Sequence, residues 1–229
     1  MTKKISSGEI FAEFLGSMFL VMASISSIIM FVYVLEAPKG VAILANAIAV
    51  GFVLCALIEI FGRVSGAHFN PAVTVIMALD KKIGTAKALL YIPVQIAGGI
   101  AGAMFSHLMF YGQKGFLLAV SDNIRNEYVF FGEIAGSFIL ILAILLLVKA
   151  KSEKISIVLG FLVGGQLMST SSTMFANPQV TIARMFTDSA SGIRPIDGLL
   201  FIVMQFIGAF LAYGVYKFMF TKKDREVQK

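Results

Sequence analysis

The sequence has few of the side chains that enzymes use for metal binding or redox chemistry. Its 229 residues include one cysteine, Cys55, and two histidines. A single cysteine excludes an intramolecular disulfide framework. Two histidines far apart in the sequence offer no cluster with metal-ligand spacing. We therefore expect no cofactor and no metal, and an enzyme is disfavoured, although spacing alone leaves open an intramembrane hydrolase that uses Ser65 and His68.

Charged residues are also scarce. Asp, Glu, Lys and Arg make up 14% of the chain and apolar residues 58%, and the mean hydropathy is +0.88. This composition excludes an ordinary soluble domain and indicates a polytopic membrane protein. Six apolar stretches are long enough to cross a bilayer, for which about 20 residues suffice. They lie near residues 8–33, 41–60, 87–111, 129–148, 155–173 and 198–220. The first is too long for a cleavable signal.

Negative charge is the scarcer sign, with 13 Asp and Glu against 19 Lys and Arg. If six spans place both termini on one side, most cations fall on that side. The five that do not are Lys39, Lys114, Arg125, Arg184 and Arg194. This bias predicts that both termini are cytoplasmic in a multi-pass protein of the cell (inner) membrane. It also argues against a nucleic-acid partner, because the excess charge is explained by topology.

Two similar strings, one in each half, carry the strongest functional signal. Residues 68–74 read HFNPAVT and residues 175–181 read FANPQVT. Asn is a favoured N-cap and Pro is favoured at the first helical position, so each string predicts a helix start. Long apolar runs precede both strings, so these helices begin at membrane depth, where irregular backbone must line protein or a water-filled cavity. Such a pair at matching places indicates a solute pathway.

The two halves repeat in other places. AEFLGS at 12–17 matches GEIAGS at 132–137, and QIAG at 95–98 matches QFIG at 205–208. We therefore expect one channel domain over 1–229, made of a first repeat at about 8–111, a linker at 112–127, a second repeat at 128–220 and a cytoplasmic tail at 221–229. An odd number of crossings per repeat inverts the second half relative to the first.

The repeat has an electrostatic consequence. If the two half-helices enter from opposite faces, their N-termini meet near the bilayer centre, and each contributes roughly half a positive charge. Each Asn accepts from its own helix while its NH₂ group donates into the cavity. Cations and protons are then repelled and neutral solutes pass. The alternative, ordinary interface helices, is disfavoured by two copies in register.

Residues 65–74, SGAHFNPAVT, resemble the first signature of the aquaporin (major intrinsic protein) family, and the resemblance extends over the whole chain. It implies an all-α membrane protein with six transmembrane helices, two re-entrant half-helices, one pore per protomer and a homotetramer. It also implies residue roles. These are a pore signature of Asn70, Pro71, Ala72, Asn177, Pro178 and Gln179, a vestibule residue His68, and loop-supporting carboxylates Glu13 and Glu133. A proton relay through the two glutamates is disfavoured, because no buried cationic partner or second carboxylate is evident nearby.

The resemblance further implies a constriction formed by four residues, located by their spacing from the two asparagines. These are Val50, Gly165, Met174 and Val180. Here the chain departs from its family. Water-selective members carry an aromatic residue, a histidine and an arginine in this ring, and glycerol-conducting members keep the arginine. Val180 stands where that arginine belongs, so the ring is expected to be wider and more apolar.

Two orientations stay open from sequence. Arg184, one turn after Val180, either faces the vestibule or pairs with Asp188. Gln179 stands where the family usually has Ala, and it either adds a hydrogen-bonding group to the lumen or turns away and packs.

We conclude that the sequence predicts a passive channel for water and small uncharged solutes. The wide ring favours glycerol and other polyols, urea and neutral metalloid acids such as arsenite. Residues 177–184 also resemble relatives of the arsenic-resistance class, and this resemblance supports metalloid transport. A water-selective channel is the alternative. A proton-coupled transporter shares the inverted repeat but needs a titratable group at the midplane, where this chain has amides. A junction protein with a blocked lumen would conduct nothing.

Overall fold

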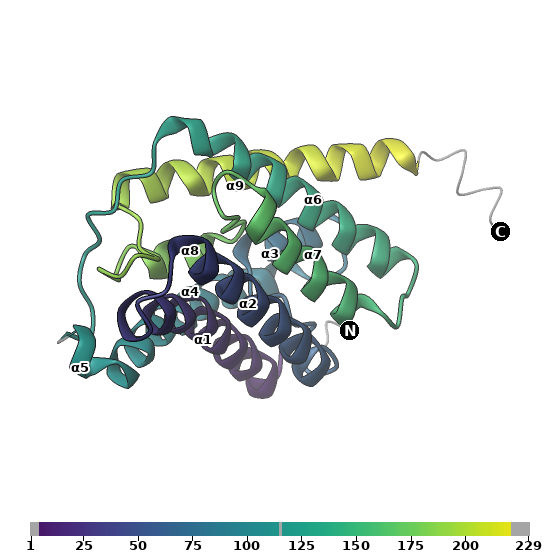
Figure 1. Ribbon diagram of the computed structural model, residues 1–229. Helices are drawn as coiled ribbons and strands as arrows, with labels where there is room; N and C mark the ends of the chain where they lie inside the picture. The colour runs from purple at the N-terminus through teal and green to yellow at the C-terminus, as the bar shows by residue number, and fades with distance from the viewer. Residues whose placement is uncertain (1–4, 115, 221–229) are drawn as a thin grey trace.

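The computed structural model describes residues 5–114 and 116–220, and over these residues the fold is helical without strands. The predicted tail at 221–229 lies outside the described residues. The long helices run alongside one another (Figure 1). They are α1 (Ser7–Ile29), α2 (Lys39–Phe61), α4 (Thr85–Met109), α6 (Phe130–Lys149), α7 (Ile155–Ser169) and α9 (Pro195–Met219). The short helices are α3 (Pro71–Leu79), α5 (Tyr111–Lys114) and α8 (Pro178–Arg184).

Five helical segments have the length and hydropathy needed to cross a bilayer, and α7, with 15 residues, is shorter. The apolar stretch at 155–173 predicted a longer helix. The structure ends it at Ser169, because Thr170 is extended with φ −99° and ψ 145°, and Thr173, Met174 and Ala176 then have positive φ angles of 58°, 34° and 44°. The chain then turns back into α8. The predicted all-α fold is confirmed.

Glycines set the spacing of the two tightest helix pairs, α1 with α4 and α6 with α9. A Cβ atom at Gly98 of α4 would lie 2.4 Å from the Phe14 carbonyl oxygen of α1. In the other half, a Cβ at Gly208 of α9 would lie 2.3 Å from the Ile134 carbonyl oxygen of α6. Small residues allow this approach in a membrane, where no water-driven force brings helices together.

We expect Gly208→Ala to destabilise the fold by about 1–3 kcal/mol, because two backbones must separate. The apparent melting temperature of the purified protein in detergent measures the effect. Gly214, six residues later on α9, is the matched control, since a Cβ there meets no atom within 4 Å. An equal melting temperature for both alanine variants would contradict the packing role of Gly208.

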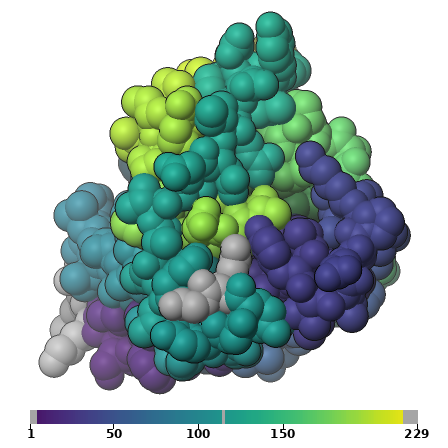
Figure 2. Space-filling view, turned by 60° about the vertical axis from the view of Figure 1, so that its left-hand side comes forward, coloured from purple at the N-terminus to yellow at the C-terminus, as the bar shows by residue number. Residues whose placement is uncertain are grey.

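The bundle has two distinct ends. At the first, here called the termini end, α1 begins and α9 finishes (Figure 1). There the Lys87 Nζ pairs with the Glu9 Oε1 at 2.7 Å. The Lys217 Nζ of α9 pairs at 2.5 Å with the Oδ1 of Asp80, which follows the end of α3. At the opposite, linker end, residues 116–126 cross the face of the molecule beside the segment 185–194 (Figure 2).

Candidate functional site

The site is built where the two short helices begin. Asn70 caps α3, its Oδ1 accepting from the backbone N–H groups of Ala72 at 2.8 Å and Val73 at 3.4 Å. Asn177 caps α8 in the same way, its Oδ1 accepting from the Gln179 N–H at 3.2 Å. Pro71 and Pro178 occupy the first helical positions, where their missing N–H groups leave no bond unmade.

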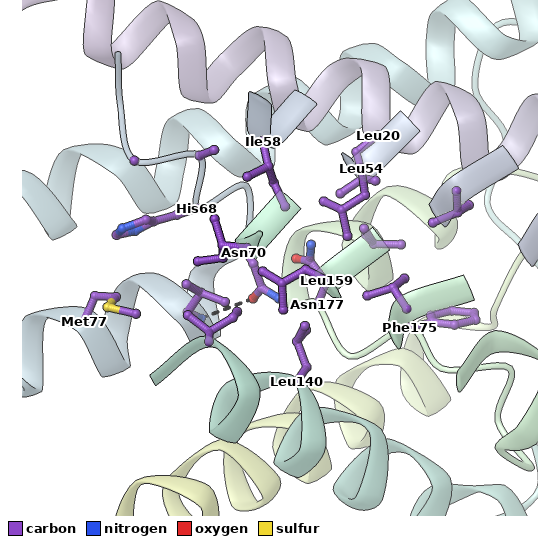
Figure 3. Close-up of a pocket in the computed structure, with 18 of the residues that line it drawn as sticks. Leu20, Leu54, Ile58, His68, Asn70, Met77, Leu140, Leu159, Phe175 and Asn177 are labelled. Carbon is purple, nitrogen blue, oxygen red and sulfur yellow. Dashed lines mark hydrogen bonds between the residues drawn. The ribbon is translucent and has the colours of Figure 1, made fainter. Parts of the chain in front are cut away.

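The two caps are also bonded to each other's loops. The Asn70 Nδ2 donates to the Ala176 carbonyl at 2.9 Å, and the Asn177 Nδ2 donates to the Phe69 carbonyl at 2.8 Å. One hydrogen of each NH₂ group is therefore used between the halves, and the second can face the cavity that both residues line. Figure 3 shows Asn70 and Asn177 together in the middle of this cavity.

The loops that lead into the caps have strained backbones. Ala67 and Phe69 have φ angles of 50° and 46°, and Met174 and Ala176 have 34° and 44°. Left-handed conformations of residues other than glycine cost about 1–3 kcal/mol each and persist only where surrounding groups impose them. Each loop therefore needs an anchor.

Glu13 anchors the first loop. Its carboxylate is fully buried and accepts from the backbone N–H groups of His68 at 3.0 Å and Phe69 at 2.8 Å. The Ser65 hydroxyl donates to it at 2.7 Å and the Gln95 Nε2 at 2.8 Å. These four donors compensate the charge without a buried cation.

Glu133 anchors the second loop by the same arrangement. It is fully buried and accepts from the N–H groups of Phe175 at 2.9 Å and Ala176 at 2.8 Å, and from the Gln205 Nε2 at 2.6 Å. Gln205 also donates to Thr181 of α8 at 2.8 Å. The same contact in the first half joins Gln95 to Thr74 of α3 at 2.9 Å.

The cavity that the two caps line has a volume of about 320 Å³ and two unlike walls. One wall consists of the loops, the caps and parts of α1, α3 and α8, and it carries backbone, hydroxyl, amide and imidazole groups beside apolar side chains such as Leu20 and Met77. The other is apolar and comes from α2, α6 and α7, on which the lining residues recur every four positions. They are Val50, Leu54 and Ile58; Leu140, Ile144 and Val148; and Ile155, Leu159, Val163 and Leu167. This spacing was visible in the sequence and could have identified the apolar wall.

Three of the four predicted constriction residues, Val50, Met174 and Val180, line the cavity. Gly165 does not, and its assignment was wrong. It is exposed, and a Cβ there meets no atom within 4 Å. Val163 and Leu167 of α7 line the cavity instead, and Gly165 points about 200° away from each. The offset from Asn177 therefore reached a residue on a face of α7 other than the one that lines the cavity.

Gln179 turns away from the lumen and packs. Its side chain is fully buried, and its Nε2 donates to the Phe69 carbonyl at 3.2 Å. A Cβ placed on Gly99 of α4 would lie 2.1 Å from the Gln179 Oε1, so the glycine provides the space for the amide. Gln179 therefore stabilises the meeting of the two halves.

This contact predicts a compensating pair. We expect Gly99→Ala alone to lower the melting temperature in detergent, because its methyl group overlaps the Gln179 amide. Adding Gln179→Ala should restore much of the loss, giving a coupling energy within the range of about 0.5–3 kcal/mol seen for contacting residues. Additive effects of the two substitutions would show that the side chains do not compete for this space.

His68 lines the cavity on the side of the termini end, beyond Asn70 in Figure 3. Its Nδ1 is 3.1 Å from the Thr74 hydroxyl, and its ring meets the edge of Tyr91, with centroids 5.7 Å apart. The Tyr91 hydroxyl donates to the Ser65 carbonyl at 2.8 Å. The Ser65 hydroxyl donates to Glu13, and the His68 ring contacts Thr74. The two residues that an intramembrane hydrolase would use therefore both make contacts that hold the loop.

Arg184 lies at the opposite end of the cavity, beside Phe175. Its side chain is 4% exposed, and its Nη2 donates to the Ser24 hydroxyl of α1. Its guanidinium carbon lies 4.1 Å from the centroid of the Phe175 ring. Of the two orientations that the sequence left open, the structure has the guanidinium at the cavity. Phe175 was not recognised from the sequence, because its position next to Arg184 depends on the fold of the loop.

Comparisons with known proteins agree with this architecture. Residues 1–176 match the family described as Major intrinsic protein. The chain is 36% identical to the aquaglyceroporin AqpS of Rhizobium meliloti (strain 1021) over 91% of this chain and 88% of that protein. It is 29% identical to aquaporin-4 of Homo sapiens over 91% of this chain and 66% of that protein. The crystal structure of the aquaglyceroporin from Plasmodium falciparum has the same fold, with a TM-score of 0.69 at 20% identity over 91% and 94% of the two chains.

Proposed function

The chain belongs to the major intrinsic protein family, a family of membrane channels rather than enzymes, and from this premise we propose that it conducts glycerol-sized neutral solutes together with water. The proposed substrates are polyols, urea and neutral metalloid acids such as arsenite. The observation that carries the proposal is the valine at position 180, which lines the cavity with no donor, ring or charge.

The two unlike walls support a polyol substrate. A polyol in an extended conformation carries hydroxyl groups along one edge and carbon along the other. Its hydroxyls can bond to Asn70, Asn177 and the neighbouring loop backbone, while its carbons lie against Leu54, Leu140 and Leu159. A narrow, wholly polar pore would suit water better, because only water can exchange all its hydrogen bonds there.

The absence of acidic groups supports the exclusion of cations. Among residues 5–114 and 116–220, the lining of the cavity includes Lys82 and Arg184 but no Asp or Glu. The N-terminal ends of α3 and α8 meet at the caps and add positive potential at the middle of the channel. A cation there loses its hydration and meets a repulsive field, so we propose that ions and protons do not pass.

The proposed roles follow from these positions. Asn70, Pro71, Ala72, Asn177 and Pro178 form the waist, and Gln179 packs behind it. Val50, Met174 and Val180 form the constriction. His68 and Arg184 line the two vestibules, and Glu13 and Glu133 anchor the loops. We further propose an inverted repeat of 8–111 and 128–220, a homotetramer, and a bacterial inner-membrane location with the termini end in the cytoplasm. The relative from Rhizobium meliloti supports the inner membrane.

Stopped-flow light scattering on proteoliposomes tests the proposal. Vesicles that contain the full chain are exposed in turn to gradients of sorbitol, glycerol, urea and arsenite, with protein-free vesicles as the control. The proposal expects faster water, glycerol and arsenite flux than in the control. Fast water flux with glycerol and arsenite at the background rate would support a water-selective channel, and background rates for all solutes would support a blocked lumen.

A further inference from the structure

A second cavity, of about 260 Å³, adjoins the channel cavity at the linker end. It is lined by parts of α1, α2, the linker and the segment after α8, and within the described residues Arg184 is the one residue that lines both cavities. Three of its lining residues are cations, Lys39, Arg125 and Arg184, and no Asp or Glu of the described part of the chain lines it. The linker end of the channel cavity therefore has three cations beside it.

Two of these cations share one aromatic ring. The guanidinium carbons of Arg184 and Arg125 lie 4.1 Å and 5.6 Å from the centroid of Phe175. The ring itself is buried, with 6% of its residue surface exposed, and packs edge-on against Phe201 at 5.2 Å. A cation–π contact orients each guanidinium but supplies no formal negative charge.

No side-chain carboxylate neutralises the two guanidiniums directly. Among the described residues, neither of the two guanidinium groups has a carboxylate oxygen within 4 Å. Glu133 contributes attraction from behind the loop, but its oxygens accept from Phe175, Ala176 and Gln205. One oxygen of Asp197 is paired with Arg194, and its other oxygen accepts from the backbone N–H of Arg125 at 2.9 Å.

Arg184 has unused donor capacity in a buried position. Its Nη2 donates to Ser24, whereas its Nε is buried and has no hydrogen-bond partner. A guanidinium stays protonated in proteins, so the charge cannot be removed by losing a proton. A buried charge without a partner is costly, and an anion from solution would offset that cost.

We propose that this linker-end cavity binds a small oxyanion, phosphate or carboxylate, between Arg184 and Arg125, with Lys39 adding attraction at the rim. Guanidinium forks bind two oxygens of such an anion at once, and lysine acts as a point charge. The functional consequence rests on the proposed channel activity. A bound anion covers the linker end of the channel cavity and slows neutral solutes that enter from this end.

Calorimetric titration of the purified full chain in detergent tests the binding itself. Phosphate, acetate and chloride are titrated separately at low ionic strength. We expect saturable binding of phosphate or acetate at one site per chain, tighter than chloride, and about tenfold weaker in Arg184→Gln and in Arg125→Gln. The first of these two anions to saturate identifies the class of oxyanion. Binding should weaken as salt rises towards 0.1 M, where screening acts over about 10 Å.

Three control measurements make the result decisive. Arg194→Gln removes a cation from the same end that is paired with Asp197 and does not line the cavity, so binding should be unchanged. Arg184→Lys keeps the charge but loses the fork, so oxyanion binding should fall while the preference over chloride disappears. Absence of saturable binding, equal binding of chloride, or equal loss in Arg194→Gln would each overturn the proposal. Water and glycerol flux of the same preparations without oxyanion tests the channel activity separately.

Discussion

Val180→Arg should reduce glycerol flux through proteoliposomes about tenfold or more and water flux by much less. The valine lines the cavity one helical turn before Arg184, so a long charged side chain would enter the lumen at the narrowest predicted ring. A tenfold reduction corresponds to a barrier increase of about 1.4 kcal/mol. Water is smaller and can exchange its hydrogen bonds with the new guanidinium, whereas glycerol loses both space and its apolar contact. The ratio of the two permeabilities is the quantity to measure.

Val180→Thr is the matched control for this substitution. It keeps the volume of the side chain and adds a hydroxyl group, so glycerol flux should stay near that of the unmodified protein. Equal losses of water and glycerol in Val180→Arg would contradict the position of Val180 in the constriction. A loss of glycerol flux in Val180→Thr would show that polarity, rather than width, controls passage there.

Glu133→Gln should lower the apparent melting temperature by roughly 6–12 °C and reduce solute flux. The glutamine has the same shape, but it loses the charge and turns an NH₂ group towards the N–H donors of Phe175 and Ala176. Hydrogen bonds to a charged group contribute about 1.5–3 kcal/mol each, so a loss of about 3 kcal/mol is expected. The strained loop then relaxes, and Asn177 no longer holds its position against Phe69.

Glu127→Gln provides the comparison for the loss of one negative charge. Glu127 is exposed and lies six residues before Glu133, at the same end of α6. Its substitution should leave both melting temperature and flux unchanged. If the two glutamine variants melt alike, Glu133 is not the anchor of the second loop. A variant that melts early but conducts normally would separate stability from channel geometry.

The parts of the fold that the sequence predicted are those controlled by local signals. The apolar stretches located the long helices, and Asn-Pro at 70–71 and 177–178 located the starts of α3 and α8. The reason is physical, because burial in a membrane and helix capping depend on a few neighbouring residues. The helix α7 ends four residues before the apolar stretch does, because Thr170 is extended, and no glycine or proline in the sequence signals that change.

The parts that the sequence could not supply depend on contacts between distant segments. Gln179 packs away from the lumen because Gly99, on another helix, leaves space for it. The sharing of Phe175 by Arg125 and Arg184 requires the linker to fold over the end of α8. Gly165 was assigned by counting along the chain, and counting does not show which face of α7 lines the cavity.

The central claim is that the paired half-helix caps form a wide pore that excludes ions and protons. Measuring glycerol uptake and proton leak in the same proteoliposomes tests this claim most directly. A glycerol gradient and a pH gradient are applied to vesicles that carry an internal pH-sensitive dye. We expect glycerol uptake well above that of protein-free vesicles, with the pH gradient decaying no faster than in those vesicles. Background glycerol uptake, or a pH gradient that collapses as glycerol enters, would contradict it.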